Sequence, residues 1–208
     1  MKKNKFSKNW IIKQKRDVYV KQSKIEGYRS RAVYKLKEIN EKFKFLKNGI
    51  QLVDLGAAPG SWSQFISKNF KNTKIVSIDL KEIEKIDDTH QIVGDFTDEH
   101  QKIKIMDYFD GKIDAVISDM AVNTTGNKSI DSIVTGELCI EALIFAKEIL
   151  KKDGQFVSKI FMGSNFNEIV ALAKKNFKET NIFKPPASRK ESKESFIICK
   201  FLKDEVKK

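Results

Sequence analysis

The chain of 208 residues is predicted to be an α/β protein with a mostly parallel sheet that carries helices on both faces. Short apolar strand patterns alternate with helical patterns along almost the whole chain, as they do in parallel sheets. Hydrophobic residues make up 40% of the sequence, which suffices for a sizeable core. No apolar run approaches the roughly 18 residues that cross a bilayer, so the sequence excludes an integral membrane protein.

The expected elements begin with a helix over residues 31–42, which Ser30 caps and in which Ala32, Leu36 and Ile39 follow one another at helical spacing. The other expected helices cover residues 61–69, a part of 98–109, 133–150 and 165–177. The expected strands cover residues 50–55, 74–79, 91–94, 113–119, 155–161, 180–183 and 195–202. No repeat and no linker-like stretch divides the chain after residue 31.

Aspartates stand at or near the ends of four of these strand patterns: Asp54, Asp79, Asp95 and Asp119. The carboxyl ends of parallel strands meet at one edge of a sheet, and ligands of such sheets bind beyond that edge. We therefore expect the four side chains to crowd one rim of the sheet and to mark a ligand site.

The turn after the first strand, from Gly56 to Gly60, favours a nucleotide-type cofactor because glycines let the backbone approach a ligand closely. Its spacing differs from the dinucleotide fingerprint, and Pro59 lacks an N–H that a pyrophosphate cradle needs. These two features disfavour a nicotinamide-dependent oxidoreductase. Asp79 suits a ribose diol, because a carboxylate accepts from both hydroxyls. A turn without any ligand is the plainer alternative.

Positive charge is concentrated at the start of the chain. Residues 1–31 hold eleven Lys and Arg against two acids, a net +9 of the total +12. Aromatic residues interleave with these cations (Trp10, Tyr19 and Tyr28), so the segment can neutralise phosphates and stack on bases. By composition alone a solubilising tail is equally consistent. We divide the chain into a basic RNA-binding arm, residues 1–28, and one domain, residues 29–208.

Two cysteines, Cys139 and Cys199, exclude a disulfide scaffold and a four-thiolate zinc site, and both are expected to be buried free thiols. The chain begins without the apolar core of a signal peptide, so we expect a cytoplasmic protein. His90 and His100 stand apart from other ligand-type residues, so no metal is expected.

Three residues stand out against their surroundings. Lys159 lies within a strand that is expected to be central and buried, where an ammonium is costly unless it is paired, and it is a candidate base or anion binder. Lys35 borders the apolar stripe of the first helix, and Asp119 ends a buried strand. The plainer interpretations are a snorkelling lysine, a solvated helix flank and a turn cap, respectively.

Together these residues resemble the FtsJ/RrmJ family of S-adenosylmethionine-dependent ribosomal RNA 2′-O-ribose methyltransferases. The matching stretches run in the family's order from about residue 10 to residue 202: Arg29 to Leu36, Asp54 to Gln64, Gly94 to Phe96, Ser118 to Ala121, Lys159 to Gly163, and Ser192 to Glu194. The resemblance implies a Rossmann-like methyltransferase fold, a sheet of seven strands with the last antiparallel, and S-adenosyl-L-methionine as cofactor.

The resemblance also implies site residues. It implies a catalytic tetrad of Lys35, Asp119, Lys159 and Glu194. It implies cofactor contacts at Gly60, Trp62, Asp79, Asp95 and Asp119. The RNA backbone is expected on the basic arm with Arg29 and Arg31. Two departures from the family pattern, Ser61 in place of Gly and Val122 in place of Pro, leave the reaction type more secure than the substrate.

The expected activity is methyl transfer to the ribose 2′-hydroxyl of a uridine in large-subunit ribosomal RNA. We expect the protein to act as a monomer and without a metal ion. Lys159 would take the proton, since Lys35 nearby and partial burial disfavour its charged form. Asp119 would orient Lys159 and complement the cationic methyl donor, and Glu194 would position Lys35 or the ribose. The alternatives are a methyltransferase of the same kind that acts on transfer RNA, and a non-catalytic RNA-binding or ribosome-assembly protein.

Overall fold

The structure, a computed structural model, describes residues 17–121, 128–163 and 165–204, without the side chains of residues 128–131. Its helices are α2 (Val18–Ile25), α3 (Ala32–Phe43), α4 (Ser61–Asn69), α5 (Glu99–Tyr108), α6 (Lys128–Ile149) and α7 (Phe166–Asn176). Its strands are β1 (Gln51–Leu55), β2 (Lys74–Asp79), β3 (Thr89–Val93), β4 (Ile113–Ser118), β5 (Leu150–Phe161), β6 (Phe177–Phe183) and β7 (Glu194–Leu202). Within the described ranges, none of the helices has both the length and the apolar content that a membrane crossing requires.

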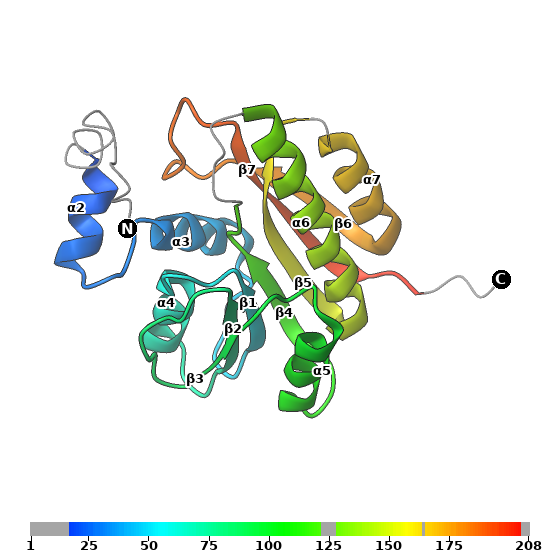
Figure 1. Cartoon of the computed structure of the whole chain (residues 1–208), viewed down its shortest axis with the longest axis horizontal. Coiled ribbons are helices and arrows are strands. Elements are labelled where there is room, and N and C mark those ends of the chain that lie inside the picture. Colours follow the sequence, from blue (N-terminus) through cyan, green and yellow to red (C-terminus); the bar gives the residue numbers. More distant parts are fainter. Residues whose placement is uncertain (1–16, 122–127, 164, 205–208) are drawn as a thin grey trace, which may run out of the picture.

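The seven strands form one sheet in the order β3-β2-β1-β4-β5-β7-β6 (Figure 1). β1 to β5 pair in parallel, and β7 runs antiparallel to both β5 and β6. The predicted fold class is confirmed, including the seven strands and the antiparallel last strand. The carboxyl ends of the five parallel strands therefore lie at one edge of the sheet, where the site is expected.

Alternating strand residues feed two cores, one on each face of the sheet, because successive side chains of a strand point to opposite faces. Val53 and Val116 pack into the core beneath α5, α6 and α7, and Leu52 and Ile117 pack into the core beneath α3 and α4. Both cysteines are free and buried, as expected.

Two boundaries differ most from the expected ones: α6 begins at Lys128 and not at residue 133, and β5 begins at Leu150, directly after α6, and not at residue 155. Its register against β4 shifts between the pairs Ile113 with Leu150 and Ala115 with Gln155. Residues 151–154 of β5 thus lie opposite the single residue Asp114 of β4, and β5 continues through this irregularity.

Helix α2 lies beside α3 (Figure 1) and was not expected from the sequence. Asp17 caps it by accepting hydrogen bonds from the backbone N–H groups of Tyr19 and Val20. The Tyr19 ring lies 5.2 Å from the ring of Tyr34 on α3, centroid to centroid. The helix spans only eight residues, so this packing stabilises it more than its own propensity does. Residues 1–16 of the predicted arm, with Trp10, lie outside the described residues. Val122, a departure from the family pattern, also lies outside them.

Candidate active site

The four predicted tetrad side chains converge on the α3 face of the sheet, and strand periodicity explains why. Asp119 follows Ile117 by two residues, and Lys159 follows Val157 by two; both apolar residues belong to the core under α3. Glu194 likewise precedes Phe196 of that core by two residues. All three polar side chains therefore point toward α3, which carries Lys35. The cluster therefore lies at the edge of the apolar core that the sheet forms with α3.

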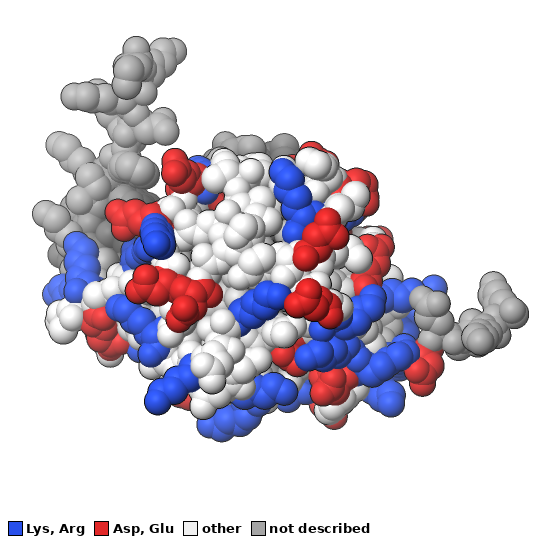
Figure 2. All heavy atoms as spheres, turned by 90° about the horizontal axis from the view of Figure 1, so that it is seen from below, with Lys and Arg blue, Asp and Glu red and all other residues white. Residues whose placement is uncertain are grey.

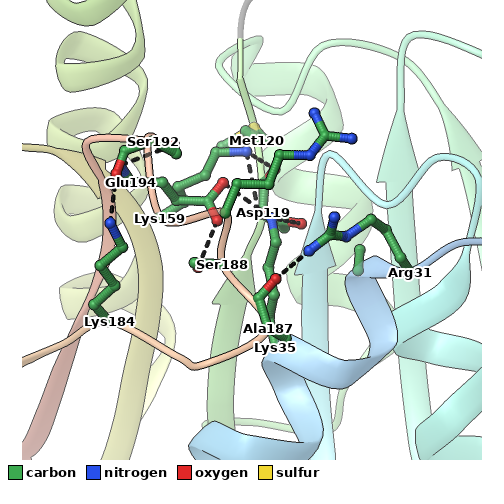
Figure 3. A network of polar contacts seen from close by, with 12 residues as sticks. Arg31, Lys35, Asp119, Met120, Lys159, Lys184, Ala187, Ser188, Ser192 and Glu194 are labelled. Carbon is green, nitrogen blue, oxygen red and sulfur yellow. Dashed lines mark hydrogen bonds and ion pairs between the residues drawn. The ribbon is translucent and has the colours of Figure 1, made fainter. Parts of the chain in front are cut away.

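Asp119 lies at the centre of this cluster (Figure 3). The Lys35 Nζ atom lies 3.2 Å from both carboxylate oxygens of Asp119 and 2.9 Å from Oε2 of Glu194. The Lys159 Nζ atom lies 3.0 Å from Oδ1 of Asp119 and also donates to the Asp119 carbonyl oxygen. The four side chains are 7–17% exposed, so these ion pairs are poorly screened by solvent.

The charges within the cluster shift one another's protonation. Burial alone lowers the pKa of Lys35, but the carboxylates of Asp119 and Glu194 outweigh burial, and the pKa is raised. Burial alone raises the pKa of Asp119, but the ammonium groups of Lys159 and Lys35 outweigh it, and the pKa is lowered. Lys35 and Asp119 are therefore fixed in their charged forms near neutral pH.

The two lysines differ in the number of anions they contact. Lys35 contacts two carboxylates, and Lys159 contacts the side chain of Asp119 alone among the ion pairs of the described residues. The two amines of the cluster therefore have different electrostatic surroundings.

Glu194 is held from its other side by Ser188, a residue that the sequence analysis missed. Ser188 donates from Oγ to Oε1 of Glu194 at 2.8 Å, so the two oxygens of the carboxylate have different partners. The next contact outward is from Glu38 on α3, whose Oε2 accepts from the backbone N–H of Ala187 at 2.8 Å. A serine in a turn-rich stretch carries no sequence signal for this role.

A cavity of about 540 Å³ opens beside the cluster at the carboxyl ends of the parallel strands. Three predicted cofactor residues line it, namely Asp79, Asp95 and Asp119. The other lining residues are Gly56, Ala58, Ile78, Leu80, Lys81, Gly94, Phe96, Met120, Ala121, Val134 and Leu138. Asp119 thus belongs both to the cavity and to the ion-pair cluster.

The carboxylates at the cavity are anchored by backbone amides. Asp79 accepts from the N–H of Ala58 through Oδ2 and from the N–H of Lys81 through Oδ1, each at 2.9 Å. Asp95 accepts through Oδ1 from the N–H and the hydroxyl of Thr97, at 2.9 and 2.8 Å. A carboxylate oxygen has more than one acceptor position, so both side chains retain capacity for a ligand.

Two predicted cofactor residues, Gly60 and Trp62, are not among the residues that line the cavity. Gly60 precedes α4 with φ of 97°, a conformation that favours glycine. Trp62 is buried and donates from Nε1 to the carbonyl of Ala32 at 2.8 Å. A cofactor contact for these two residues stays a prediction.

Asp54 differs from the other strand-end aspartates, because it lies one residue before the end of β1 and is fully buried. Its Oδ2 accepts from the hydroxyl of Ser63 at 2.7 Å, and that hydroxyl also contacts Ser77. Burial raises the pKa of Asp54 to about 7. The expected rim of four acids is therefore a rim of three, with the fourth acid beneath it.

The predicted RNA contacts, Arg29 and Arg31, both bind protein oxygens. Arg29 donates to the carbonyls of Pro59, Glu84 and Lys85, and Arg31 binds the Asp17 carboxylate and the Ala187 carbonyl. A direct contact of either side chain with RNA stays a prediction. Among the described residues, no three His, Cys, Asp or Glu side chains are grouped for a metal ion.

Known proteins are similar to this chain in sequence and in fold. The chain is 65% identical over 203 residues to the ribosomal RNA large subunit methyltransferase E of Pelagibacter ubique, across 98% of this chain and 100% of that protein. The protein of the same name from Rickettsia akari is 48% identical over 199 residues, across 93% of this chain and 88% of that one.

Among solved structures, one from Plasmodium falciparum, described as a ribosomal RNA methyltransferase, gives a TM-score of 0.75 at 33% identity and covers 84% of this chain and 98% of its own. Human methyltransferase-like protein 13 in complex with SAH gives 0.58 at 14% identity, across 82% of this chain and 85% of its own, a likeness of fold alone. Residues 28–202 match the family described as FtsJ-like methyltransferase. From this match and the 65% identity, the chain belongs to the FtsJ-like methyltransferase family.

Proposed function

We propose that the protein transfers a methyl group from S-adenosyl-L-methionine to a ribose 2′-hydroxyl, that of a uridine in large-subunit ribosomal RNA, with Lys159 as the proton acceptor. The observation that carries this proposal is the buried amine of Lys159, which pairs with Asp119, a residue that also lines the strand-end cavity. The names of the relatives from Pelagibacter ubique and Rickettsia akari support large-subunit ribosomal RNA as the substrate. We further propose that the protein acts as a monomer in the cytoplasm.

The residues of the cavity fit S-adenosyl-L-methionine. Asp79 has acceptor positions left for the two ribose hydroxyls, and Asp95 has them for the adenine edge. The Asp119 carboxylate places negative charge where a cationic ligand enters. When bound, this cofactor supplies a methyl group activated by a positively charged sulfonium.

Proton removal is the step that the protein's own side chains perform. A ribose hydroxyl is a weak nucleophile until a base draws its proton away. Neutral Lys159 would accept that proton, because it faces one carboxylate where Lys35 faces two. Lys35 then stays charged, and the pair of Asp119 and Glu194 balances both ammonium groups after the transfer.

The other residues of the cluster position these groups. Asp119 holds Lys159 by its side chain and by its carbonyl, so it fixes the direction of the amine. Glu194 holds Lys35 from the side opposite to Asp119. A large part of the rate is expected to come from alignment of the hydroxyl with the methyl group, which such fixed side chains provide.

RNA is proposed to bind along the basic arm. Lys21 and Lys24 of α2 are exposed, and charge in the arm neutralises phosphates. A guanidinium has five donors, of which the described bonds use three at Arg29 and two at Arg31, so both residues retain donors for RNA. The face seen in Figure 2 has Lys and Arg interspersed with Asp and Glu.

The test is to incubate the protein with labelled S-adenosylmethionine and, separately, large ribosomal subunits, free ribosomal RNA and transfer RNA, and to map alkali-resistant positions. We expect label on one ribose of large-subunit RNA. Label on transfer RNA alone would move the substrate to the alternative class. Label on a base, or none on any RNA while a known methyltransferase labels the same samples, would contradict the proposal.

A further inference from the structure

We propose that Arg29 is a positioning residue for the cofactor cavity: it ties the glycine-rich turn after β1 to the connection between β2 and β3, so that cofactor affinity depends on a side chain that directly follows the basic arm. The inference rests on the proposed use of S-adenosyl-L-methionine. It assigns Arg29 a task inside the protein in addition to any contact with RNA.

The guanidinium of Arg29 bridges two segments that are 25 residues apart in the chain. Its Nη1 atom donates to the carbonyl of Pro59 at 3.1 Å and to the carbonyl of Glu84 at 2.9 Å. Its Nη2 atom donates to the carbonyl of Lys85 at 3.0 Å. The side chain is 16% exposed, so these bonds to a charged donor are partly shielded from water.

Both bridged segments lead into the cavity. Ala58, the neighbour of Pro59, lines the cavity, and so do Leu80 and Lys81 at the start of the β2–β3 connection. Residues 80–88 of this connection form neither helix nor strand, so few backbone hydrogen bonds of their own fix them. A side chain that binds two successive carbonyls there restricts the conformations of the connection, and with it one wall of the cavity.

The turn approaches Arg29 very closely at Gly60. A Cβ atom added at Gly60 would lie 2.7 Å from Nη1 of Arg29 and 2.8 Å from Cδ1 of Ile86. The glycine therefore leaves room for both the guanidinium and the connection to pack against the turn. This close packing supports a fixed geometry of the three segments and not a loose surface contact.

The arginine two residues later provides a natural control, because it serves the other half of the site. Arg31 binds Asp17 and the carbonyl of Ala187, next to Ser188, which holds Glu194. Its side chain is also 16% exposed. The two residues thus have the same type, the same charge and the same exposure, and differ in the loops that they hold.

The contact needs the shape of an arginine and not only its charge. A planar guanidinium directs several N–H groups at fixed angles, whereas a lysine offers a single nitrogen at the end of a flexible chain. Arg29→Lys retains the charge that attracts RNA but cannot reach three carbonyls with separate donors. This substitution separates a positioning role from a purely electrostatic one.

The first measurement is the dissociation constant for S-adenosylmethionine, by calorimetry without RNA. We expect a rise of about tenfold for Arg29→Met and about fivefold for Arg29→Lys, within the usual range of coupling between sites. Arg31→Met and Glu84→Gln should stay within twofold, since the Glu84 carboxylate is 92% exposed and its carbonyl is retained. In turnover at saturating RNA, Arg29→Lys should raise the KM for the cofactor by a larger factor than it lowers kcat, a division that general destabilisation does not produce.

The second measurement is hydrogen exchange on the cofactor-free protein, which is independent of the proposed function. Amides of residues 80–88 should exchange faster in Arg29→Met and in Arg29→Lys than in Arg31→Met. Unchanged exchange in that segment, or a cofactor dissociation constant within twofold of the parent in both Arg29 variants, overturns the inference. If the parent protein binds no S-adenosylmethionine, the proposed function fails, and the exchange result still decides the role of Arg29.

Discussion

The ion-pair cluster and the cofactor cavity lie side by side at one edge of the sheet and share Asp119, yet their polar groups are satisfied in different ways. In the cluster, Lys35, Asp119 and Glu194 bind one another's side chains. In the cavity, Asp79 accepts from the backbone N–H groups of Ala58 and Lys81, and Asp95 accepts from that of Thr97. The cluster is therefore a closed set of paired charges, and the cavity is a rim of anchored acceptors with capacity to spare.

This difference divides the chemistry between the two regions. Paired charges fix protonation states, as the raised pKa of Lys35 and the lowered pKa of Asp119 show, and they suit proton handling. Anchored acceptors suit recognition of a ligand that donates hydrogen bonds. Changes in the cluster should therefore lower the rate, and changes in the cavity should weaken the cofactor.

Asp119→Asn should have the largest effect, because Asp119 belongs to both regions. A neutral amide cannot balance the ammonium of Lys35 and the ammonium that forms on Lys159 during the transfer, so we expect kcat to fall by about 10³-fold or more and the cofactor dissociation constant to rise about tenfold. Turnover at saturating cofactor and calorimetry measure the two quantities. A loss in only one of them would show that the regions do not share this residue functionally.

Asp79→Asn should weaken the cofactor by about 10- to 100-fold and leave kcat at saturation within about threefold. The variant loses a charged acceptor, and its amide oxygen must serve a backbone N–H that the carboxylate served before. Equilibrium binding and a cofactor titration of the rate report this. A fall in kcat similar to that of the cluster variants would contradict the division.

Ser188→Ala should lower kcat about tenfold with an unchanged cofactor dissociation constant. The substitution frees Oε1 of Glu194, so the carboxylate is less firmly directed at Lys35. Ser188→Thr keeps the hydroxyl and should restore most of the rate. If alanine and threonine variants are equally slow, the effect comes from packing of the turn and not from the hydrogen bond.

Asp54→Asn should have the smallest effect on activity, and its signature is the pH dependence of stability. The folded-state pKa of about 7 lies above the ordinary value of 3.8, so between these pH values the folded protein keeps a proton that the unfolded chain has released. The contribution of Asp54 to the free energy of unfolding is then fully present below about pH 4 and is lost as pH rises to 7.

Urea unfolding of the parent protein and of Asp54→Asn at several pH values checks this expectation. The stability of the parent relative to the variant should fall by up to about 1.4 kcal/mol per pH unit in that window. The difference between the two proteins isolates Asp54 from the other carboxylates. A difference that is constant with pH would mean that Asp54 is ionised throughout.

The same two regions show which parts of the site can be predicted from the sequence. The cavity follows from general rules, because strand ends can be read from apolar runs and the aspartates after them mark the edge. Asp79 and Asp95 line the cavity, as predicted, and Asp54 does not. Asp54 lies one residue before the end of β1, where its side chain is part of the core and not of the rim.

The cluster depends on long-range packing. Its four members lie far apart in the sequence, between positions 35 and 194. Their local surroundings alone indicated only that Lys159 and Lys35 are unusual in position, without showing that they meet. The resemblance to a family assembled them, and the structure brings the four together. Helix α2 and Ser188 escaped prediction, since tertiary contacts with Tyr34 and with Glu194 define them and no local pattern does.

The central claim, that the amine of Lys159 accepts the hydroxyl proton, is tested most directly by chemical rescue. Lys159→Ala should bind S-adenosylmethionine as the parent does, within twofold by calorimetry, and should transfer methyl groups to RNA at a rate that is undetectable or nearly so. Small primary amines added to this variant should restore part of the rate, and the restored rate should rise with the concentration of the neutral amine and with its basicity. Full activity of Lys159→Ala without added amine, or rescue that follows only the protonated amine, would contradict the claim.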